Sequence, residues 1–72
     1  MLKYKIDVLK ELKEKGYNTG VLRREKLLSE SAIQKLREGR PIAWESIDAI
    51  CRLLKIQPGK LLEYIPDEEN KD

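Results

Sequence analysis

The segment 29–39, SESAIQKLREG, most constrains how this chain can fold, because it specifies both ends and one face of a helix. Ser29 suits an N-cap, because its hydroxyl can accept a hydrogen bond from the free backbone N–H groups of the first turn. Gly39 suits the C-terminal end, because glycine adopts the left-handed conformation at little cost. At about 100° per residue, one side of this helix is apolar. Its members are Ala32, Ile33 and Leu36.

The opposite side of this helix is short and polar. It carries Glu30, Ser31, Gln34, Lys35 and Glu38. Such a face can lie in the major groove of DNA and contact base edges. An ordinary surface helix with a solvated face has the same pattern, so this face alone does not separate the two interpretations.

Apolar residues at helical spacing predict four more helices, separated by glycine, proline or capping residues. We expect them at about 5–15, 20–26 and 43–54, with a short last helix that follows Pro58 and ends near Tyr64. Asn18 or Thr19 can cap the second. No segment has the alternation of a strand. We therefore expect an all-α domain of five helices over residues 1–66, followed by a polar, frayed tail at 67–72.

The composition argues against catalysis and against a metal site. The 72-residue chain has no histidine, which removes the commonest general base and the commonest metal ligand. Its one cysteine, Cys51, cannot form an intrachain disulfide, and its apolar surroundings in the sequence predict a small core residue. We expect no enzymatic activity and no cofactor. No apolar run approaches the roughly 20 residues of a membrane span, so we expect a cytoplasmic protein.

Charge is distributed unevenly between the two parts of the chain. Residues 1–40 hold 11 Lys and Arg against 6 Asp and Glu, a net charge of +5. Residues 41–72 hold 4 against 7, a net charge of −3. A basic part beside an acidic part favours an oriented encounter with a polyanion.

Four apolar residues have the spacing of a helix-turn-helix, in which one helix braces the next against DNA. They are Leu22, Leu28, Ile33 and Leu36. Together with YKIDVLKELKEKGYNT, LRREKLLSESAIQKLREG, ESIDAICRLLKIQPGKLLEY and the closing IPDE, they resemble the Cro/repressor-like, or Xre-like, helix-turn-helix regulators. The chain looks closest to the short, single-domain members found in bacteria and their mobile elements. The resemblance covers about residues 5–66.

This resemblance implies a five-helix, lambda-repressor-like domain that binds double-stranded DNA in a sequence-specific manner and regulates transcription, with the helix at 29–39 in the major groove. The base-facing positions of the family correspond to Glu30, Ser31 and Lys35, with Gln34 beside them. Gln34 can bond adenine, Lys35 can donate to guanine, and Glu30 can accept from a cytosine amine. Lys35 and Gln34 could instead be plain surface residues.

The phosphate-contacting positions of the family correspond to Asn18 and Thr19 at the start of the bracing helix. Free N–H groups and the helix dipole favour an anion there. Arg40, just past the groove helix, matches another backbone-contact position, although it could be a solubilising charge only. Arg24 is a further candidate for phosphate contact.

The turn between the two helices departs from the family pattern. Arg23 stands where a small residue is expected, Lys26 where an apolar one is expected, and Leu27 where the turn glycine is expected. A leucine at positive φ is costly. We therefore expect a different turn geometry, in which Leu27 is buried and Lys26 points outward.

Two questions stay open at this point. Trp44 is favoured as an anchor of the fourth helix in the core, and the alternative is an exposed aromatic at an interface. The leading hypothesis for function is a repressor of the Cro kind that binds a two-fold operator as a homodimer. The alternative is a protein-interaction module on the same fold, such as an antirepressor or an antitoxin-like partner, which the acidic residues Glu30 and Glu38 motivate.

Overall fold

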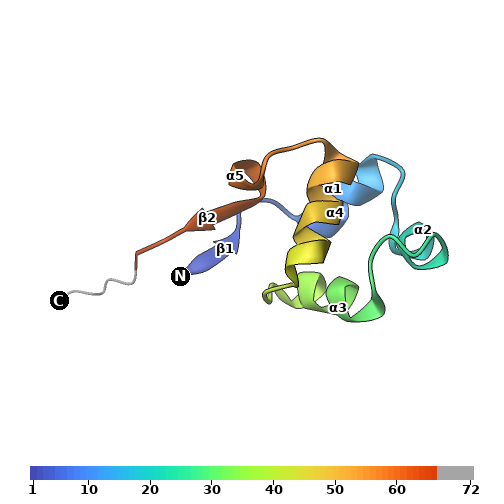
Figure 1. Ribbon diagram of the computed structural model, residues 1–72, viewed down its shortest axis with the longest axis horizontal. Helices are drawn as coiled ribbons and strands as arrows, with labels where there is room; N and C mark the ends of the chain where they lie inside the picture. The colour runs from blue at the N-terminus through green and yellow to red at the C-terminus, as the bar shows by residue number, and fades with distance from the viewer. Residues whose placement is uncertain (67–72) are drawn as a thin grey trace.

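Five helices lie in the predicted order, and a short strand lies at each end of the described chain (Figure 1). The computed structural model describes residues 1–66. The predicted tail at 67–72 lies outside the described residues. The elements are β1 (Leu2–Tyr4), α1 (Val8–Glu14), α2 (Thr19–Arg24), α3 (Glu30–Glu38), α4 (Trp44–Leu54), α5 (Pro58–Leu61) and β2 (Leu62–Tyr64).

Side-chain caps fix where the first three helices begin. The side chains of Asp7, Asn18 and Ser29 accept hydrogen bonds from backbone N–H groups three residues further on, at 3.3, 2.9 and 3.0 Å. The cap at Asp7 explains why α1 begins at Val8 and not near residue 5. At the other end of α3, Gly39 has φ of +73°, as its predicted role requires. Both ends of the segment that specified a helix are therefore confirmed.

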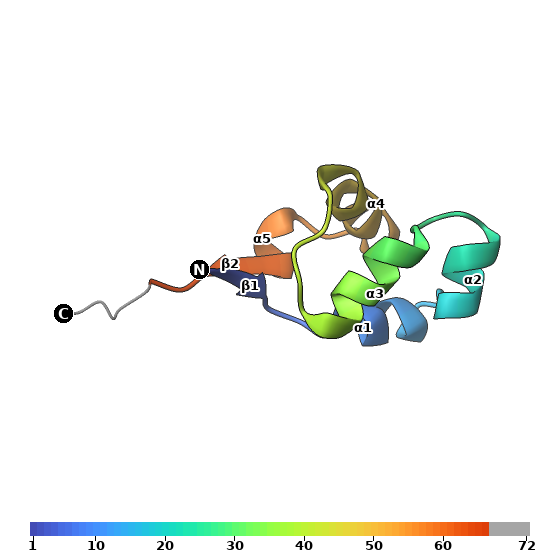
Figure 2. The same ribbon diagram turned by 90° about the horizontal axis from the view of Figure 1, so that it is seen from below.

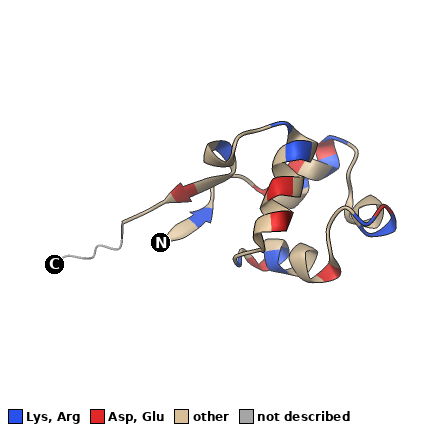
Figure 3. Ribbon diagram, viewed as in Figure 1, with Lys and Arg blue, Asp and Glu red and all other residues tan. Residues whose placement is uncertain are grey.

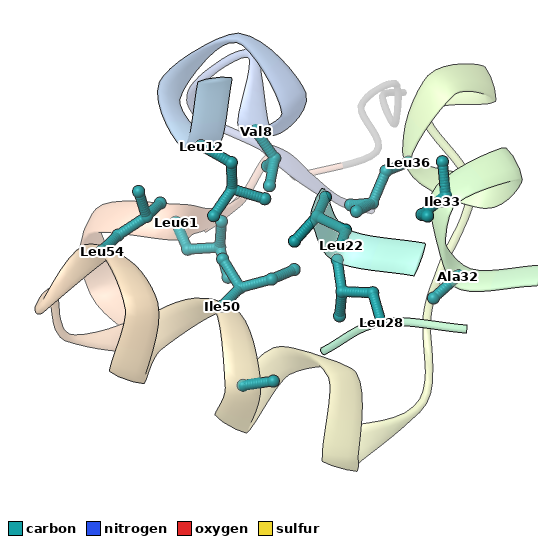
Figure 4. Close-up of a cluster of buried hydrophobic side chains, with 11 residues drawn as sticks. Val8, Leu12, Leu22, Leu28, Ala32, Ile33, Leu36, Ile50, Leu54 and Leu61 are labelled. Carbon is teal, nitrogen blue, oxygen red and sulfur yellow. The ribbon is translucent and has the colours of Figure 1, made fainter. Parts of the chain in front are cut away.

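The core lies between α1, α3 and α4, and Leu22 of α2 and Leu61 of α5 complete it (Figure 4). The apolar side of α3 is buried, as predicted, and Ile33 is completely inaccessible. Each large side chain buried in this way stabilises the fold by about 1.5–3 kcal/mol. The core residues are Val8, Leu12, Leu22, Leu28, Ala32, Ile33, Leu36, Ala49, Ile50, Leu54 and Leu61.

The five expected helices are present, but a two-stranded sheet that the sequence did not indicate corrects the expectation of a purely helical domain. β1 and β2 pair antiparallel, with Leu2 opposite Tyr64 and Tyr4 opposite Leu62. The expected last helix therefore ends at Leu61, and Leu62 is already extended. Three residues per strand are too few for a recognisable alternation, and the partners come from opposite ends of the sequence. The sheet ties the N-terminal segment to the end of α5.

The turn between α2 and α3 has the geometry that its unusual residues predict. The positive φ, +55°, falls on exposed Lys26 and not on Leu27. Leu27 is partly buried against the core, and its N–H donates to the carbonyl of Leu22 at 2.9 Å. The left-handed conformation is thus adopted by Lys26, one residue before the position where the family has glycine. This arrangement lets the side chain of Leu27 point inward.

Candidate nucleic-acid interface

The outer face of α3 is open along the side of the molecule that Figure 2 shows from below, with α2 beside one end of the helix and the β1–β2 sheet beyond the other. Glu30, Ser31 and Gln34 are exposed on this face. Lys35 is only partly exposed, because it lies at the edge of the buried side. The structure therefore brings the four predicted base-contacting residues onto one helix, three facing solvent and one at its margin.

An ion pair joins the end of α2 to the start of α3. Arg23 donates from Nε and Nη2 to the two carboxylate oxygens of Glu30, at 2.5 and 3.1 Å. These hydrogen bonds lower the pKa of Glu30 and raise that of Arg23. Glu30 is therefore held ionised as an acceptor, and its charge is opposed by a neighbouring guanidinium. This pair also accounts for an arginine where the family pattern has a small residue.

A second network links the exposed polar residues in the last turns of α3. The amide nitrogen of Gln34 donates to Glu38 at 2.7 Å, and its amide oxygen accepts from Arg37 at 3.1 Å. Arg40 donates to the other oxygen of Glu38, also at 3.1 Å. The pKa of Glu38 is lowered, first by the bond from Gln34 and then by that from Arg40. Glu38 thus joins two candidate DNA-contacting side chains, Gln34 and Arg40.

This network uses only part of the hydrogen-bonding capacity of the Gln34 amide. A carboxamide has two donor hydrogens and two acceptor lone pairs. One of each is engaged within α3, so one donor and one acceptor remain. In the major groove, adenine presents one acceptor and one donor, and these pair with the remaining donor and acceptor of Gln34.

The start of α2 forms one flank of this face. Asn18 caps the helix through its side-chain oxygen, which leaves its amide nitrogen as a donor. Thr19 is partly buried beside it. Two lysines of α1, Lys10 and Lys13, line the same shallow depression as Asn18 and Thr19. Sequence reasoning missed these lysines, and their positive charge at helical spacing on a neighbouring helix was the only available signal.

Arg40 and Arg24 lie at separate places on the surface. Arg40 follows α3, and its carbonyl accepts a hydrogen bond from the hydroxyl of Tyr4 at 2.6 Å. Arg24, at the end of α2, lies 3.6 Å from a carboxylate oxygen of Glu25. The two arginines therefore do not share one anion-binding position. In Figure 3, Lys and Arg appear on several elements, including β1, α2, α3 and α5, and are interspersed with Asp and Glu.

Trp44 is not an anchor of the core, which corrects the favoured prediction. It is 84% exposed. Trp44 is the first residue of α4 and shares a side with Ile47 and Cys51, which are only partly buried, whereas Ile50 and Leu54 form the buried stripe. Cys51 packs partly buried against the core, and burial raises the pKa of its thiol.

These features define a helix-turn-helix protein: a bracing α2, a turn whose Leu27 and Leu28 pack inward, and an α3 whose outer face is polar. The family model described as "Cro/C1-type HTH DNA-binding domain" matches residues 7–67. The chain belongs to this family of DNA-binding regulators, as the sequence resemblance predicted. β1 precedes the matched region.

Comparison with curated proteins and with solved structures gave no match. Within residues 1–66, no helix is long and apolar enough to cross a membrane. The same residues contain no group of three or more His, Cys, Asp or Glu arranged to hold a metal ion.

Proposed function

We propose that this protein is a sequence-specific regulator of transcription, acting as a repressor, and that α3 enters the major groove of duplex DNA. The observation that carries the proposal is the outer face of α3. Glu30 is held in a defined orientation by Arg23 of α2, and Gln34 by Arg37 and Glu38, whereas the opposite side of α3 forms the core. Oriented donors and acceptors on a groove-sized helix are what direct base readout requires.

Four residues make the proposed base contacts. Gln34 offers a donor and an acceptor to adenine, and Ser31 offers a hydroxyl beside it. Glu30, positioned by Arg23, accepts from a cytosine amine. Lys35 reaches guanine from the margin of the face, because the flexible stem of lysine allows its ammonium group to extend outward while the methylenes stay packed.

The proposed phosphate contacts set the register of α3 on the duplex. Asn18 and Thr19 bind the backbone on one side, with Lys10 and Lys13 adding charge from the same depression. On the other sides, Arg40 and Arg24 serve separate phosphates. Because Arg40 is already paired with Glu38, it gives up or shares that bond when a phosphate binds.

A homodimer on a two-fold operator completes the proposal. Two copies related by such an axis would present their α3 helices to successive major grooves, about 34 Å apart. Regulation would then follow from protein concentration or from competition for the operator.

Selection of bound sites from random duplexes, followed by titration at several salt concentrations, tests the proposal. We expect a recurrent palindromic site and an affinity that falls linearly in log salt, with a slope near −0.9 per phosphate neutralised. Negligible binding to every duplex would overturn the proposal and favour the protein-interaction module. The paired state of Glu30 and Glu38 weakens the motive for that alternative, since each carboxylate is opposed by an arginine.

A further inference from the structure

The large exposed apolar residues of the described chain lie in or beside the β1–β2 sheet, at the end of the molecule opposite α2, and at the start of α4. We call them the end patch, and they are Met1, Leu2, Trp44, Tyr64 and Ile65. The register of the sheet places Leu2 opposite Tyr64, and a groove of about 260 Å³ connects Leu2 with Trp44. Figures 1 and 2 both show the sheet at this end and α2 at the other, with α3 between them.

The sheet has one apolar face and one charged face. Leu2, Tyr4, Leu62 and Tyr64 share a face, because side chains two residues apart point the same way and the register pairs them. Tyr4 and Leu62 pack on the core, whereas Leu2 and Tyr64 continue the same face beyond it, 67% and 65% exposed. The apolar face of the sheet thus extends beyond the core, and no part of residues 1–66 covers its outer half at Leu2 and Tyr64.

We propose that a second copy of this chain covers the end patch, and that Trp44 of each copy lies in the groove of the other. This inference rests on the proposed function and specifies the contact that the homodimer uses. For side chains of this size Leu2, Trp44 and Tyr64 together present about 400 Å² of apolar surface, within the range of the largest patch that a monomer exposes. With Met1, Ile65 and a polar rim around them, the contact approaches the roughly 800 Å² per partner of a stable interface.

The position of the end patch also suits a two-fold operator. A two-fold axis through the patch, directed toward the side on which α3 lies, places both α3 helices on the same side of the dimer. The two α2 helices then lie at the outer ends. One straight duplex can therefore meet both copies at once.

The contact is a packing of faces and not an extension of the sheet. A β2–β2 pairing centred on Glu63 would set two glutamates opposite each other, which is destabilising. A pairing centred one residue later would bring Pro66, which has no N–H to donate, into the ladder. Residues 67–72, DEENKD, carry no apolar side chain that could cover the patch in its place.

Sedimentation equilibrium of the full chain without DNA tests the contact directly. We expect a monomer–dimer equilibrium, and the emission of Trp44, the only tryptophan, should shift to the blue as concentration rises. Trp44→Ala should weaken dimerisation at least tenfold, since an aromatic that fills a partner groove is a typical hot spot. Because Trp44 is 84% exposed, the variant should keep its helical circular dichroism. Tyr64→Ala, on the strand, should act in the same direction, and Glu14→Ala on α1 is the control.

The outcomes separate this inference from the proposed function. A wild-type chain that stays monomeric at every concentration, or a Trp44→Ala chain that dimerises as the wild type does, overturns the contact. Neither result bears on DNA binding, which is measured on a duplex half-site that one copy can occupy. If Trp44→Ala binds the half-site as the wild type does but loses cooperative binding to the full palindrome, the contact is supported. A chain that dimerises through Trp44 yet binds no duplex supports the contact and overturns the proposed function alone.

Discussion

At the scale of single residues, hydrogen bonds between neighbouring side chains orient the groups on α3 that are proposed to read bases. Gln34 is bonded at both ends of its amide, and Glu30 is held by two bonds from Arg23. Side chains held in this way lose less conformational freedom on binding than free ones do. In the proposed function, polar residues of α3 therefore contribute to specificity in two ways, some by contacting bases and others by orienting those contacts.

Gln34→Ala should weaken binding to the preferred duplex by about 1–3 kcal/mol, because a bidentate contact to adenine is lost. Competition against duplexes altered at one base pair at a time measures the effect, and the preference should relax at one position of each half-site. Gln57→Ala is the matched control, since Gln57 is also exposed but precedes α5. If Gln34→Ala weakens all duplexes equally, Gln34 contacts the backbone and not a base.

Arg40→Ala should weaken every duplex by a similar factor and reduce the salt slope by about 1, because one phosphate contact is removed. Half-site binding at several salt concentrations provides the measurement. Arg52→Ala is a close control: Arg52 and Arg40 are 64% and 63% exposed, and each donates to a carboxylate at 3.1 Å. An unchanged slope for Arg40→Ala would remove Arg40 from the interface.

At the scale of helices and the turns between them, α2 and α3 are held together by the inward packing of Leu27 and Leu28 in the turn and by the Arg23–Glu30 pair. The hydrogen bonds from Arg23 lower the pKa of Glu30 in the folded state. A group whose folded pKa is depressed contributes stability above its unfolded pKa, and that contribution is lost as the pH falls through the folded pKa. The link between the two helices should therefore weaken in acid.

Glu30→Gln should make the free energy of unfolding less dependent on pH in the acidic range. Near neutral pH the variant should be less stable than the wild type, and the difference should shrink as the pH falls below the ordinary glutamate value. Urea unfolding at neutral and acidic pH measures both quantities, with Glu14→Gln as the control. A variant whose stability falls in acid as steeply as that of the wild type would show that the pair has no net effect on folding.

Sequence reasoning located the helices well, because caps and glycine act over three or four residues. Ser29, Gly39 and the position of Lys26 in the turn all follow from local chemistry. It missed the bond between Arg23 and Glu30, since the two residues belong to different helices and meet only once the turn has formed. Trp44 was misplaced because the half-buried side of α4 lies directly beside its buried side around the helix. The spacing of apolar residues alone does not separate two adjoining sides of this kind.

At the scale of the whole molecule, the two ends of the described chain meet in the sheet, and no local pattern could predict that. The partners Leu2 and Tyr64 are far apart in sequence, and each strand is only three residues long. The family match begins after β1, so the family pattern could not supply the strand either. The sheet nevertheless determines which apolar residues stay exposed, and therefore where a second copy can bind.

Deletion of residues 2–4 should separate the roles of the two ends of the molecule. The deletion removes β1, the packing of Tyr4 and its bond to the carbonyl of Arg40, so the free energy of unfolding should fall by roughly 1–3 kcal/mol. The side-chain caps of α2 and α3 come from Asn18 and Ser29 and do not involve these residues, so half-site binding should persist while dimerisation is lost. Circular dichroism, sedimentation and half-site titration of the same preparation measure the three effects. Loss of half-site binding in a folded variant would mean that β1 supports the groove helix through Tyr4 and Arg40, and that the two ends of the molecule are not independent.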